Sequence, residues 1–400
     1  MKLLLDQEGM RVIAEVFITF LKLGCTSFGG PVAHLGYFQN EFVNRKKWLD
    51  ESSYADLVGL CQFLPGPASS QVGMGIGFSR AGLPGALAAW VGFTLPSAIL
   101  LVLFALGLTY FQDQLGSQWL HGLKVAAVAV VAQALLNMFP KLCPDRKRVV
   151  LALLIAMVVT AQPAALGQVV ALFFAGLWGW FFLKDQASLP HQPASLNLSR
   201  SRGLVFLSLF FVFLIVLPLL AGVTDSQTLK YFDSFYRAGS LVFGGGHVVL
   251  PLLQSEIVRQ GWISQESFMA GYGAAQAVPG PLFTFAAYLG AASLVAPNGW
   301  LGALVCLVAV FLPSLLLIVG ILPYWEKMRA HKKLRTAMAG MNAGVVGLLV
   351  AAFYNPVVTY GILNLKDVLL AAICLSLLVF AKWPSWSIVL MSAVATGVLW

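Results

Sequence analysis

The sequence predicts an all-α polytopic membrane protein with about 13 spans, built as two inverted repeats of about six spans around one connecting helix. Hydrophobic residues make up 59% of the chain and charged residues only 10%, whereas soluble domains carry roughly 25% charged residues. The mean hydropathy is +0.83. So few charges could not cover the surface of a soluble domain of 400 residues. The repeat is indicated by Gln-x-x-Pro-Gly-Pro, which occurs at 62–67 and again at 276–281.

The first repeat contains six apolar runs, each close to the ~20 residues that a helix needs to cross a bilayer. Pro-Gly-Pro breaks the second run, because proline restricts both itself and the residue before it. The fifth run is short and would depend on its neighbours or on local thinning of the bilayer. The six runs are 11–31, 54–80, 83–110, 120–140, 148–163 and 165–183.

A polar linker at 184–202, rich in Pro, Ser, Asn and basic residues, is predicted to be an exposed loop. The apolar run 203–222 follows it, has no partner in the other half and is predicted to be the connector. The second repeat then has six runs of its own, with 267–292 broken by Pro-Gly-Pro and 366–381 short. They are 233–251, 267–292, 299–322, 335–354, 366–381 and 384–400.

The two halves match at a nearly constant spacing, which indicates an internal repeat. KLGCTSFGG at 22–30 matches RAGSLVFGG at 237–245, and Glu41 matches Glu256 at the same offset of 215. Leu-Pro-Ser at 95–97 matches Leu-Pro-Ser at 312–314. The predicted units are therefore residues 1–183, the linker and connector at 184–222, and residues 223–400.

The net charge of +9 is concentrated in loops between apolar runs, which is typical of the positive-inside rule and not of a nucleic-acid surface. With the N-terminus in the cytoplasm and each broken run crossing once, most basic loops face the cytoplasm. Arg45, Lys46 and Lys47 are the exception and fall outside. Seven crossings then separate the starts of the two halves, so the halves are inverted. If the Pro-Gly-Pro runs are re-entrant instead, the parity changes and the halves become parallel.

The sequence lacks the signals of an enzyme, a metal site or a cofactor site. It contains no His-Glu-x-x-His motif, no P-loop and no C-x-x-C pair. The five cysteines are predicted to be small buried hydrophobes. They are Cys25, Cys61, Cys143, Cys306 and Cys374.

Inverted repeats with broken helices are typical of secondary transporters, whose site lies between the repeats near mid-membrane. Half-helix N-termini in such sites favour anions. Two kinds of break occur here: Phe28-Gly29-Gly30-Pro31 with its twin Phe243-Gly244-Gly245-Gly246, and the Pro-Gly-Pro pair at 65–67 and 279–281. The alternative is that these motifs only kink helices and let them pack closely.

Lys22 and Arg237 occupy equivalent positions in the two repeats and together could neutralise a dianion. A cation inside a span costs at least ~2.5–3.5 kcal/mol on insertion scales, so it normally has a partner or a role. The alternative is snorkelling to the interface, or pairing of Lys22 with Glu15. Gln62 and Gln276 precede the two Pro-Gly-Pro breaks and could donate hydrogen bonds to oxyanion oxygens.

Five further residues are candidates for gating or coupling. Glu41 and Glu256 are predicted gates or proton carriers. Arg80 either guides anions or marks the cytoplasmic side of its span. His34 and His247 follow the glycine breaks, where they either take part in proton coupling or are lone polar residues of a helix.

The sequence resembles the chromate ion transporter family in its long, two-repeat form. The resemblance is carried by FLKLGCTSFGGPVAHLGYFQNEFV (20–43), LVGLCQFLPGPASSQVGMGIG (57–77), FYRAGSLVFGGGHVVLPLLQSEIV (235–258) and GYGAAQAVPGPLFTFAAYLGA (271–291). It implies secondary active efflux of chromate across the bacterial inner membrane, chromate resistance, and sulfate as a competitor. Composition and spacing alone support an anion carrier.

Three alternatives remain open at this point. The chain could import or exchange sulfate or another inorganic anion. It could be a membrane enzyme that reduces chromate, although no ligand pattern for flavin or haem is present. It could also be a membrane scaffold or sensor. A homodimer is left open as its assembly.

Overall fold

Every regular element in the described part of the chain is a helix. The computed structural model describes residues 7–111, 118–162, 165–184, 199–243 and 246–399. Five helices in these ranges are long and apolar enough to cross a membrane, so the prediction of 13 spans is not confirmed. They lie in α4 (Ala68–Phe111), α5 (Gln118–Leu142), α8 (Arg200–Val223), α13 (Gly299–Ile321) and α15 (Lys332–Ala352), the last of which continues into η6 (Phe353–Val358) and α16 (Thr359–Gly361).

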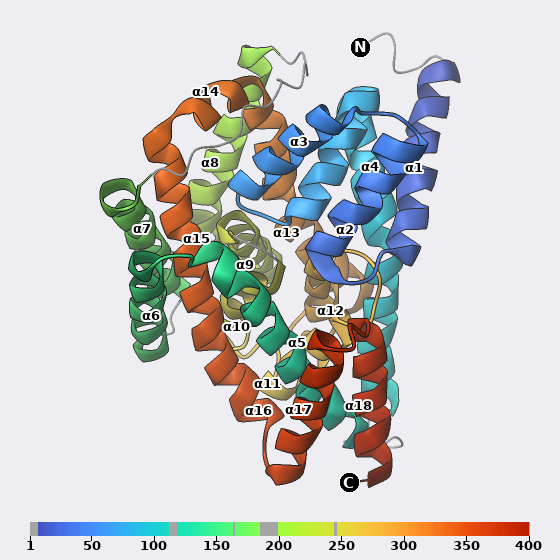
Figure 1. The fold of residues 1–400 in the computed structure, drawn as a ribbon. Coiled ribbons are helices and arrows are strands. Elements are labelled where there is room, and N and C mark those ends of the chain that lie inside the picture. The colour runs from blue at the N-terminus through green and yellow to red at the C-terminus, as the bar shows by residue number, and fades with distance from the viewer. Residues whose placement is uncertain (1–6, 112–117, 163–164, 185–198, 244–245, 400) are drawn as a thin grey trace.

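The first predicted span is interrupted at its glycines and continues as a second helix. α1 (Gln7–Thr26) ends before Gly29 and Gly30, whose φ angles of 98° and 77° favour glycine. α2 (Gly30–Phe38) then starts with Pro31 in its first turn, where proline is tolerated. α1 runs from the top of the view to its middle and α2 returns upward (Figure 1). Neither α2 nor the π-helical turn η2 (Gln39–Arg45) that follows it is predicted from the apolar runs of the sequence.

An ion pair fixes where this return ends. The Lys46 Nζ lies 2.7 Å from the Glu15 Oε1, and Glu15 is in the N-terminal half of α1. The loop that carries Arg45, Lys46 and Lys47 therefore lies beside the beginning of the chain's first helix. The chain from Gly30 to Lys46 has turned back along α1.

The first Pro-Gly-Pro also lies where the chain turns back. α3 (Glu51–Phe63) ends before it and α4 begins after it. α4 itself has a sharp hinge, with non-helical angles at Ala81 and Gly82. Its two parts pack so closely that a methyl group on Gly77 would collide with the Gly85 carbonyl. Glycines allow this close approach of helix backbones.

The second half repeats this order of elements. A hairpin between the fourth and fifth helices of this half is again held by glycines, because a methyl group on Gly290 would collide with the Gly302 carbonyl. The elements are α9 (Gln227–Leu241), η3 (Gly246–Val248), α10 (Val249–Ile257), α11 (Gln265–Ala275), η4 (Leu282–Thr284), α12 (Phe285–Ala291) and α13.

The last two helices of each half pack on a long helix of the other half. α6 (Arg146–Ala161) and α7 (Ala165–Phe182) pack on α15 of the second half, while α17 (Leu365–Val379) and α18 (Ser385–Leu399) pack on α5 of the first (Figure 1). The short elements η5 (Leu322–Tyr324) and α14 (Trp325–Ala330) connect α13 to α15 at the top of the view. The two halves are thus interlocked.

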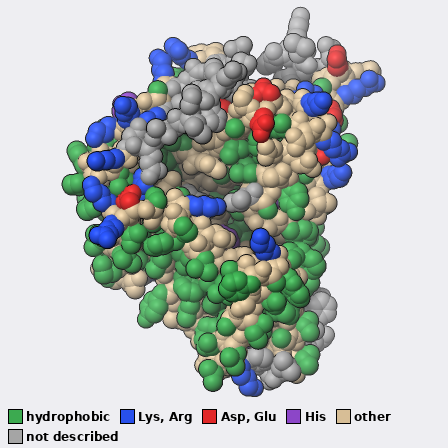
Figure 2. Space-filling view, viewed as in Figure 1, with side chains coloured by type: hydrophobic (Ala, Val, Ile, Leu, Met, Phe, Trp, Pro, Cys, Tyr) green, Lys and Arg blue, Asp and Glu red, His purple; other side chains and the backbone are tan. Residues whose placement is uncertain are grey.

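The surface is largely apolar. Hydrophobic side chains cover the lower part of the face seen in Figure 2, while most Lys and Arg side chains gather in its upper part. The most apolar 18 residues of the connector α8 have a mean hydropathy of 3.0, and only 11% of this stretch is buried. A helix that exposes so much apolar surface matches a lipid environment.

Candidate functional site

The four helix breaks meet at the centre of the molecule through two equivalent hydrogen bonds. The Gly66 N–H donates to the Val242 carbonyl at 2.6 Å, and the Gly280 N–H donates to the Ser27 carbonyl at 2.9 Å. Gly66 and Gly280 are the glycines of the two Pro-Gly-Pro motifs. Val242 and Ser27 each lie two residues before the glycine pair of the opposite half. Each Pro-Gly-Pro break is therefore bonded to the glycine break of the other repeat.

The repeated Leu-Pro-Ser motifs complete this crossing. An added Cβ on Gly66 would lie 2.5 Å from the Ser314 Oγ, and one on Gly280 would lie 2.9 Å from the Ser97 Oγ. The φ angles of Gly66 and Gly280 are 119° and 94°, which other residues rarely adopt. Glycine is thus required at both positions by conformation and by space.

A cavity of about 450 Å³ reaches this crossing from both repeats. Gly29, Gly30, Gln62 and Gly66 line it from the first repeat, and His247 lines it from the second. Helices α5 and α15 complete its wall with Gln133, Asn137, Lys141 and Asn342. Figure 2 shows a hollow in the upper centre of this face.

The lining of this cavity suits an anion. Among the described residues, Lys141 is the only Lys or Arg that lines it, and no carboxylate does. The N-terminus of α2 opens into it at Gly29, Gly30 and Pro31 without a side-chain cap. Uncapped N–H groups at a helix N-terminus carry a partial positive charge and bind anions.

Lys22 does not line this cavity. It lies exposed on α1, and among the described residues it forms no ion pair. The predicted alternative, pairing of Lys22 with Glu15, is not seen, because Glu15 pairs with Lys46.

Arg237, the twin of Lys22, is held between two buried carboxylates. Its guanidinium donates to the Asp233 carboxylate from Nε at 3.0 Å and from Nη2 at 2.8 Å. It also donates to Glu256 from Nη1 at 2.8 Å and from Nη2 at 2.9 Å. The Ser234 hydroxyl adds a further bond to Glu256 at 3.0 Å. Arg237 is thus bonded to two acids and lies outside the cavity lining.

The other predicted gating residues also have partners. Glu41 pairs with Arg45 at 3.0 Å, so both equivalent glutamates are bound to an arginine. The Arg80 guanidinium stacks on the Trp48 ring at 4.9 Å, at the exposed end of the first part of α4. The His34 Nδ1 lies 3.3 Å from the Ser69 Oγ, and the His247 Nδ1 lies 2.9 Å from the Tyr272 hydroxyl.

The remaining predicted residues shape the breaks and do not line this cavity. The Pro65 carbonyl accepts from the Gln71 Nε2 and the Pro281 carbonyl accepts from the Thr284 Oγ1, both at 2.7 Å. Gly244 and Gly245 lie outside the described residues. The others in this group are Phe28, Pro67, Phe243, Gln276, Pro279 and Gly280.

Sequence analysis missed the polar residues that α5 and α15 bring to the cavity. None of these four residues, Gln133, Asn137, Lys141 and Asn342, is among the predicted site residues. At the offset of 218 that matches α5 to α15, Asn137 falls on Asn355 and Asn342 falls on Lys124. Gln133 and Lys141 fall on Ala351 and Thr359, so the repeat did not single out these two. The signal that could have found them is a row of polar residues, Gln133, Asn137 and Lys141, four apart on one face of α5.

Comparison with known proteins gave a consistent result. The family model described as Chromate transporter matches residues 14–180 and 229–398. The chain is 28% identical to the chromate transport protein of Pseudomonas aeruginosa, over 84% of this chain and 79% of that protein. It is 27% identical to the chromate transport protein of Cupriavidus metallidurans, over 97% of this chain and 93% of that protein. It is also 28% identical to a probable chromate transport protein of Synechococcus elongatus, over 95% and 94%. No solved structure matches this chain.

Proposed function

The chain belongs to the chromate transporter family, and we propose that it is a secondary active exporter of chromate in the cytoplasmic membrane that confers chromate resistance. One observation carries the proposal: a cavity that the described residues line with a lysine and no carboxylate reaches the glycine breaks of both repeats. A tetrahedral dianion needs donors and positive charge, and this cavity supplies both. The relatives named chromate transport protein support chromate as the substrate.

We place chromate in this cavity, at the N-terminus of α2. Backbone N–H groups near Gly29 and Gly30 face its oxygens, and the Gln62 amide adds hydrogen bonds. Lys141 supplies the positive charge at the mouth. The direct roles predicted for Lys22 and Arg237 remain predictions, which the transport assay below also tests.

The proposed topology has five crossings and, in each half, three pairs of half-helices that enter the membrane and return. The pairs in the first half are α1 with α2, α3 with the first part of α4, and α6 with α7. Three crossings then separate the starts of the two halves: the second part of α4, α5 and α8. Three is odd, so the halves are inverted even though the Pro-Gly-Pro segments are re-entrant. The parallel arrangement predicted from the sequence assumed that only the Pro-Gly-Pro run of each half is re-entrant.

In this proposal, the inverted halves allow alternating access to one site. The larger cavity reaches the crossing from one side only, and rocking one half against the other would open the second side. With the N-terminus in the cytoplasm, this cavity is the cytoplasmic opening. The inside-negative potential then favours export of a dianion by ~2.3 kcal/mol per charge per 100 mV.

The transport proposal is tested by radiolabelled chromate uptake into everted membrane vesicles under an imposed membrane potential. We expect Lys141→Gln to lower uptake at subsaturating chromate by about tenfold, because a charged hydrogen bond to the substrate is lost. Lys22→Gln, which removes an exposed cation outside the cavity, is the matched control, and Arg237→Ala is assayed beside it. Equal loss in Lys141→Gln and Lys22→Gln would contradict the placement of the site.

Sulfate transport is the second candidate function, because the cavity chemistry does not distinguish two tetrahedral dianions. The same vesicles are assayed with radiolabelled sulfate, alone and as a competitor. Sulfate flux without chromate flux would keep the architecture and change the substrate. Flux of neither anion would contradict the transporter proposal.

The proposed topology places the loop of Arg45 to Lys47 in the cytoplasm, whereas 13 crossings would place it outside. We expect Asn44→Cys, an exposed position of η2 next to this loop, to react with a membrane-impermeant maleimide in everted vesicles and not in intact cells. Exposed Cys25 is first replaced by serine. Leu363→Cys, which both arrangements place outside and which is 67% exposed, is the control with the opposite pattern. Labelling of Asn44→Cys in intact cells would contradict the re-entrant arrangement.

A further inference from the structure

A second polar cavity lies between α10 and the end of α15, and nothing described above uses it. Its volume is about 250 Å³, several times the ~30 Å³ share of one water molecule. Both repeats contribute to it: α6 and α7 from the first, and α10, the start of α11 and the end of the α15 region from the second. The α15 region ends at the bottom of the view, away from the larger cavity at the end of α5 (Figure 1).

The charge that lines this cavity is positive. Of the residues that the structure describes, Arg259 is the only Lys or Arg that lines it, and no Asp or Glu does. Within the described residues, no carboxylate forms an ion pair with Arg259. Its near neighbour Glu256 pairs with Arg237 on the α9 side of α10. An unpaired guanidinium at a polar cavity is a binding group for an oxyanion.

The floor of the cavity contains polar atoms that lack partners. Gln168 is 2% exposed, its Nε2 donates to the Pro251 carbonyl at 3.3 Å, and its Oε1 has no hydrogen-bond partner in the described part of the chain. The Gln265 Oε1 accepts from the Gln254 Nε2 at 3.1 Å, which leaves the buried Gln265 Nε2 as an unpartnered donor. Buried polar atoms without partners are costly, so each calls for a ligand or water.

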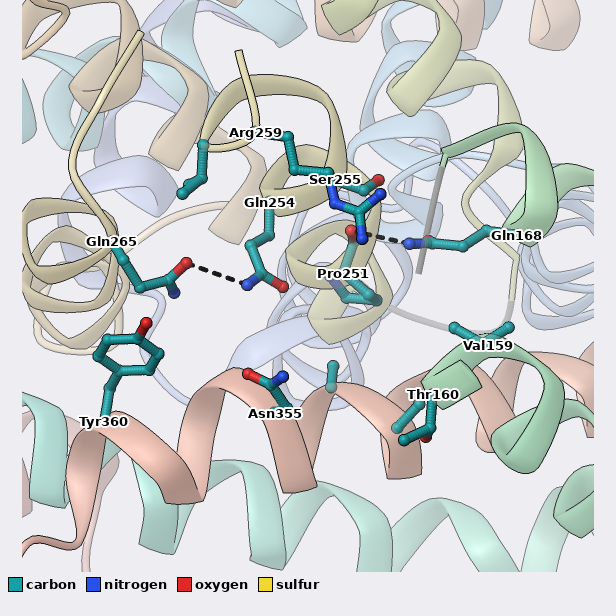
Figure 3. Close-up of a pocket in the computed structure, with 13 residues that line it drawn as sticks. Val159, Thr160, Gln168, Pro251, Gln254, Ser255, Arg259, Gln265, Asn355 and Tyr360 are labelled. Carbon is teal, nitrogen blue, oxygen red and sulfur yellow. Dashed lines mark hydrogen bonds between the residues drawn. The ribbon is translucent and has the colours of Figure 1, made fainter. Parts of the chain in front are cut away.

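The side chains converge on the space (Figure 3). The Gln265 amide and the Tyr360 hydroxyl point toward each other on one side, while the Arg259 guanidinium reaches toward Gln168 on the other. Asn355 points into the middle from the α15 side. Arg259, Asn355 and Tyr360 are exposed, so they form the mouth above a buried floor. The cation therefore lies where an ion would arrive from or leave to solvent.

The repeat gives this cavity its place in transport. α10, α11 and α15 are the counterparts of α2, α3 and α5, which line the larger cavity. Each cavity thus lies between a pair of short helices and one long helix, and the two cavities are at opposite ends of the molecule. The larger cavity reaches the glycine breaks. The smaller cavity occupies only the outer part of the space between its three helices.

We infer that the smaller cavity is a second binding site for a tetrahedral oxyanion, on the outer side of the crossing, with Arg259 as its cation. This inference rests on the proposed transport function and adds to it the place where the exported ion binds before release. Gln265 and Asn355 donate hydrogen bonds beside Arg259. The Gln168 Oε1 accepts from a water of the bound ion or from a protonated oxyanion oxygen.

Two cysteine reporters test this inference independently of transport. Val258→Cys lines the smaller cavity and Met138→Cys lines the larger one. Both are made with Cys25→Ser and Cys61→Ala, since Cys25 is exposed and Cys61 lines the larger cavity. The full chain in nanodiscs is treated with a small neutral thiol reagent, with and without chromate or sulfate, and thermal unfolding confirms that each variant is folded.

We expect chromate to slow labelling of both reporters. Arg259→Gln should raise the chromate concentration that protects Val258→Cys by about tenfold and leave Met138→Cys unchanged, while Arg259→Lys keeps part of the protection. Lys141→Gln should have the reverse effect. Two results would overturn the second site. In the first, chromate does not protect Val258→Cys; in the second, Arg259→Gln leaves that protection unchanged. Chromate flux measured on the same variants separates that result from failure of the transport proposal.

Discussion

Replacement of Arg237 by alanine is expected to destabilise the folded protein by about 3–5 kcal/mol, because it leaves two buried carboxylates without their cation. Asp233 and Glu256 are 5% and 7% exposed, and each receives two donor groups of the Arg237 guanidinium. An unpaired buried charge retains its desolvation cost but loses the attraction that offset it. The measurement is equilibrium unfolding of the purified protein in detergent.

The repeat supplies the control for this experiment. Lys22 occupies the position equivalent to Arg237, is exposed and forms no ion pair within the described residues. Lys22→Ala should therefore change stability by no more than about 0.5 kcal/mol. Equal destabilisation by the two substitutions would show that the ion pairs of Arg237 contribute little.

A triple variant separates charge from packing at the same site. Removing all three charges in Asp233→Asn, Arg237→Ala and Glu256→Gln leaves no uncompensated carboxylate. This variant should be more stable than Arg237→Ala alone, because directly interacting groups are not additive. A triple variant that is less stable than the single one would attribute the loss to packing instead.

The pairing of Arg237 also shows that the internal repeat does not predict which side chains pair. The equivalence of Lys22 and Arg237 is real in the sequence, but the two side chains have different surroundings. Asp233 has Ile18 as its counterpart, so only the second repeat has a carboxylate one turn before the cation. An internal repeat predicts backbone position, whereas pairing depends on neighbours that the two copies do not share.

The helix breaks, in contrast, could be predicted from local chemistry. Gly-Gly and Pro-Gly-Pro disfavour the continuation of a helix, and α1, α3 and α11 end two to four residues before these motifs. Their meeting at one crossing follows from the pairing of Gly66 with Val242 and of Gly280 with Ser27. That pairing joins residues more than 170 positions apart, so no local pattern could specify it.

Whether a broken segment crosses or returns could not be decided from hydropathy. Length and apolar composition are the same for one helix of 20 residues and for two half-helices that fold back. The deciding contacts are tertiary: Lys46 with Glu15, and the close approach of Gly77 to Gly85. In the proposed topology, the return of α2 places the basic loop at 45–47, an exception to the positive-inside rule under 13 crossings, on the cytoplasmic side.

The crossing should also be the point at which the smallest added group has the largest effect on transport. Gly66→Ala places a methyl group 2.5 Å from the Ser314 Oγ and 2.7 Å from the Gln71 Nε2, at a φ of 119°. The backbone conformation alone costs an L-residue about 1–3 kcal/mol, and the methyl group must also displace its neighbours. We expect chromate uptake in vesicles to be lost and the free energy of unfolding to fall by at least about 2 kcal/mol.

A second substitution tests whether the clash at Ser314 is the cause. The Ser314 Oγ is buried and has no hydrogen-bond partner within the described residues, so Ser314→Ala alone should be neutral or slightly stabilising. Combined with Gly66→Ala, it removes the atom nearest to the new methyl group and should restore part of the stability, while the cost of the backbone conformation remains. Gly82→Ala, with a φ of 60° and no atom within 4 Å of the added Cβ, is the control for that conformational cost. If Gly66→Ala were no worse than Gly82→Ala, the close contact of the two repeats at this glycine would not limit the fold, and the crossing could tolerate a wider gap than the structure shows.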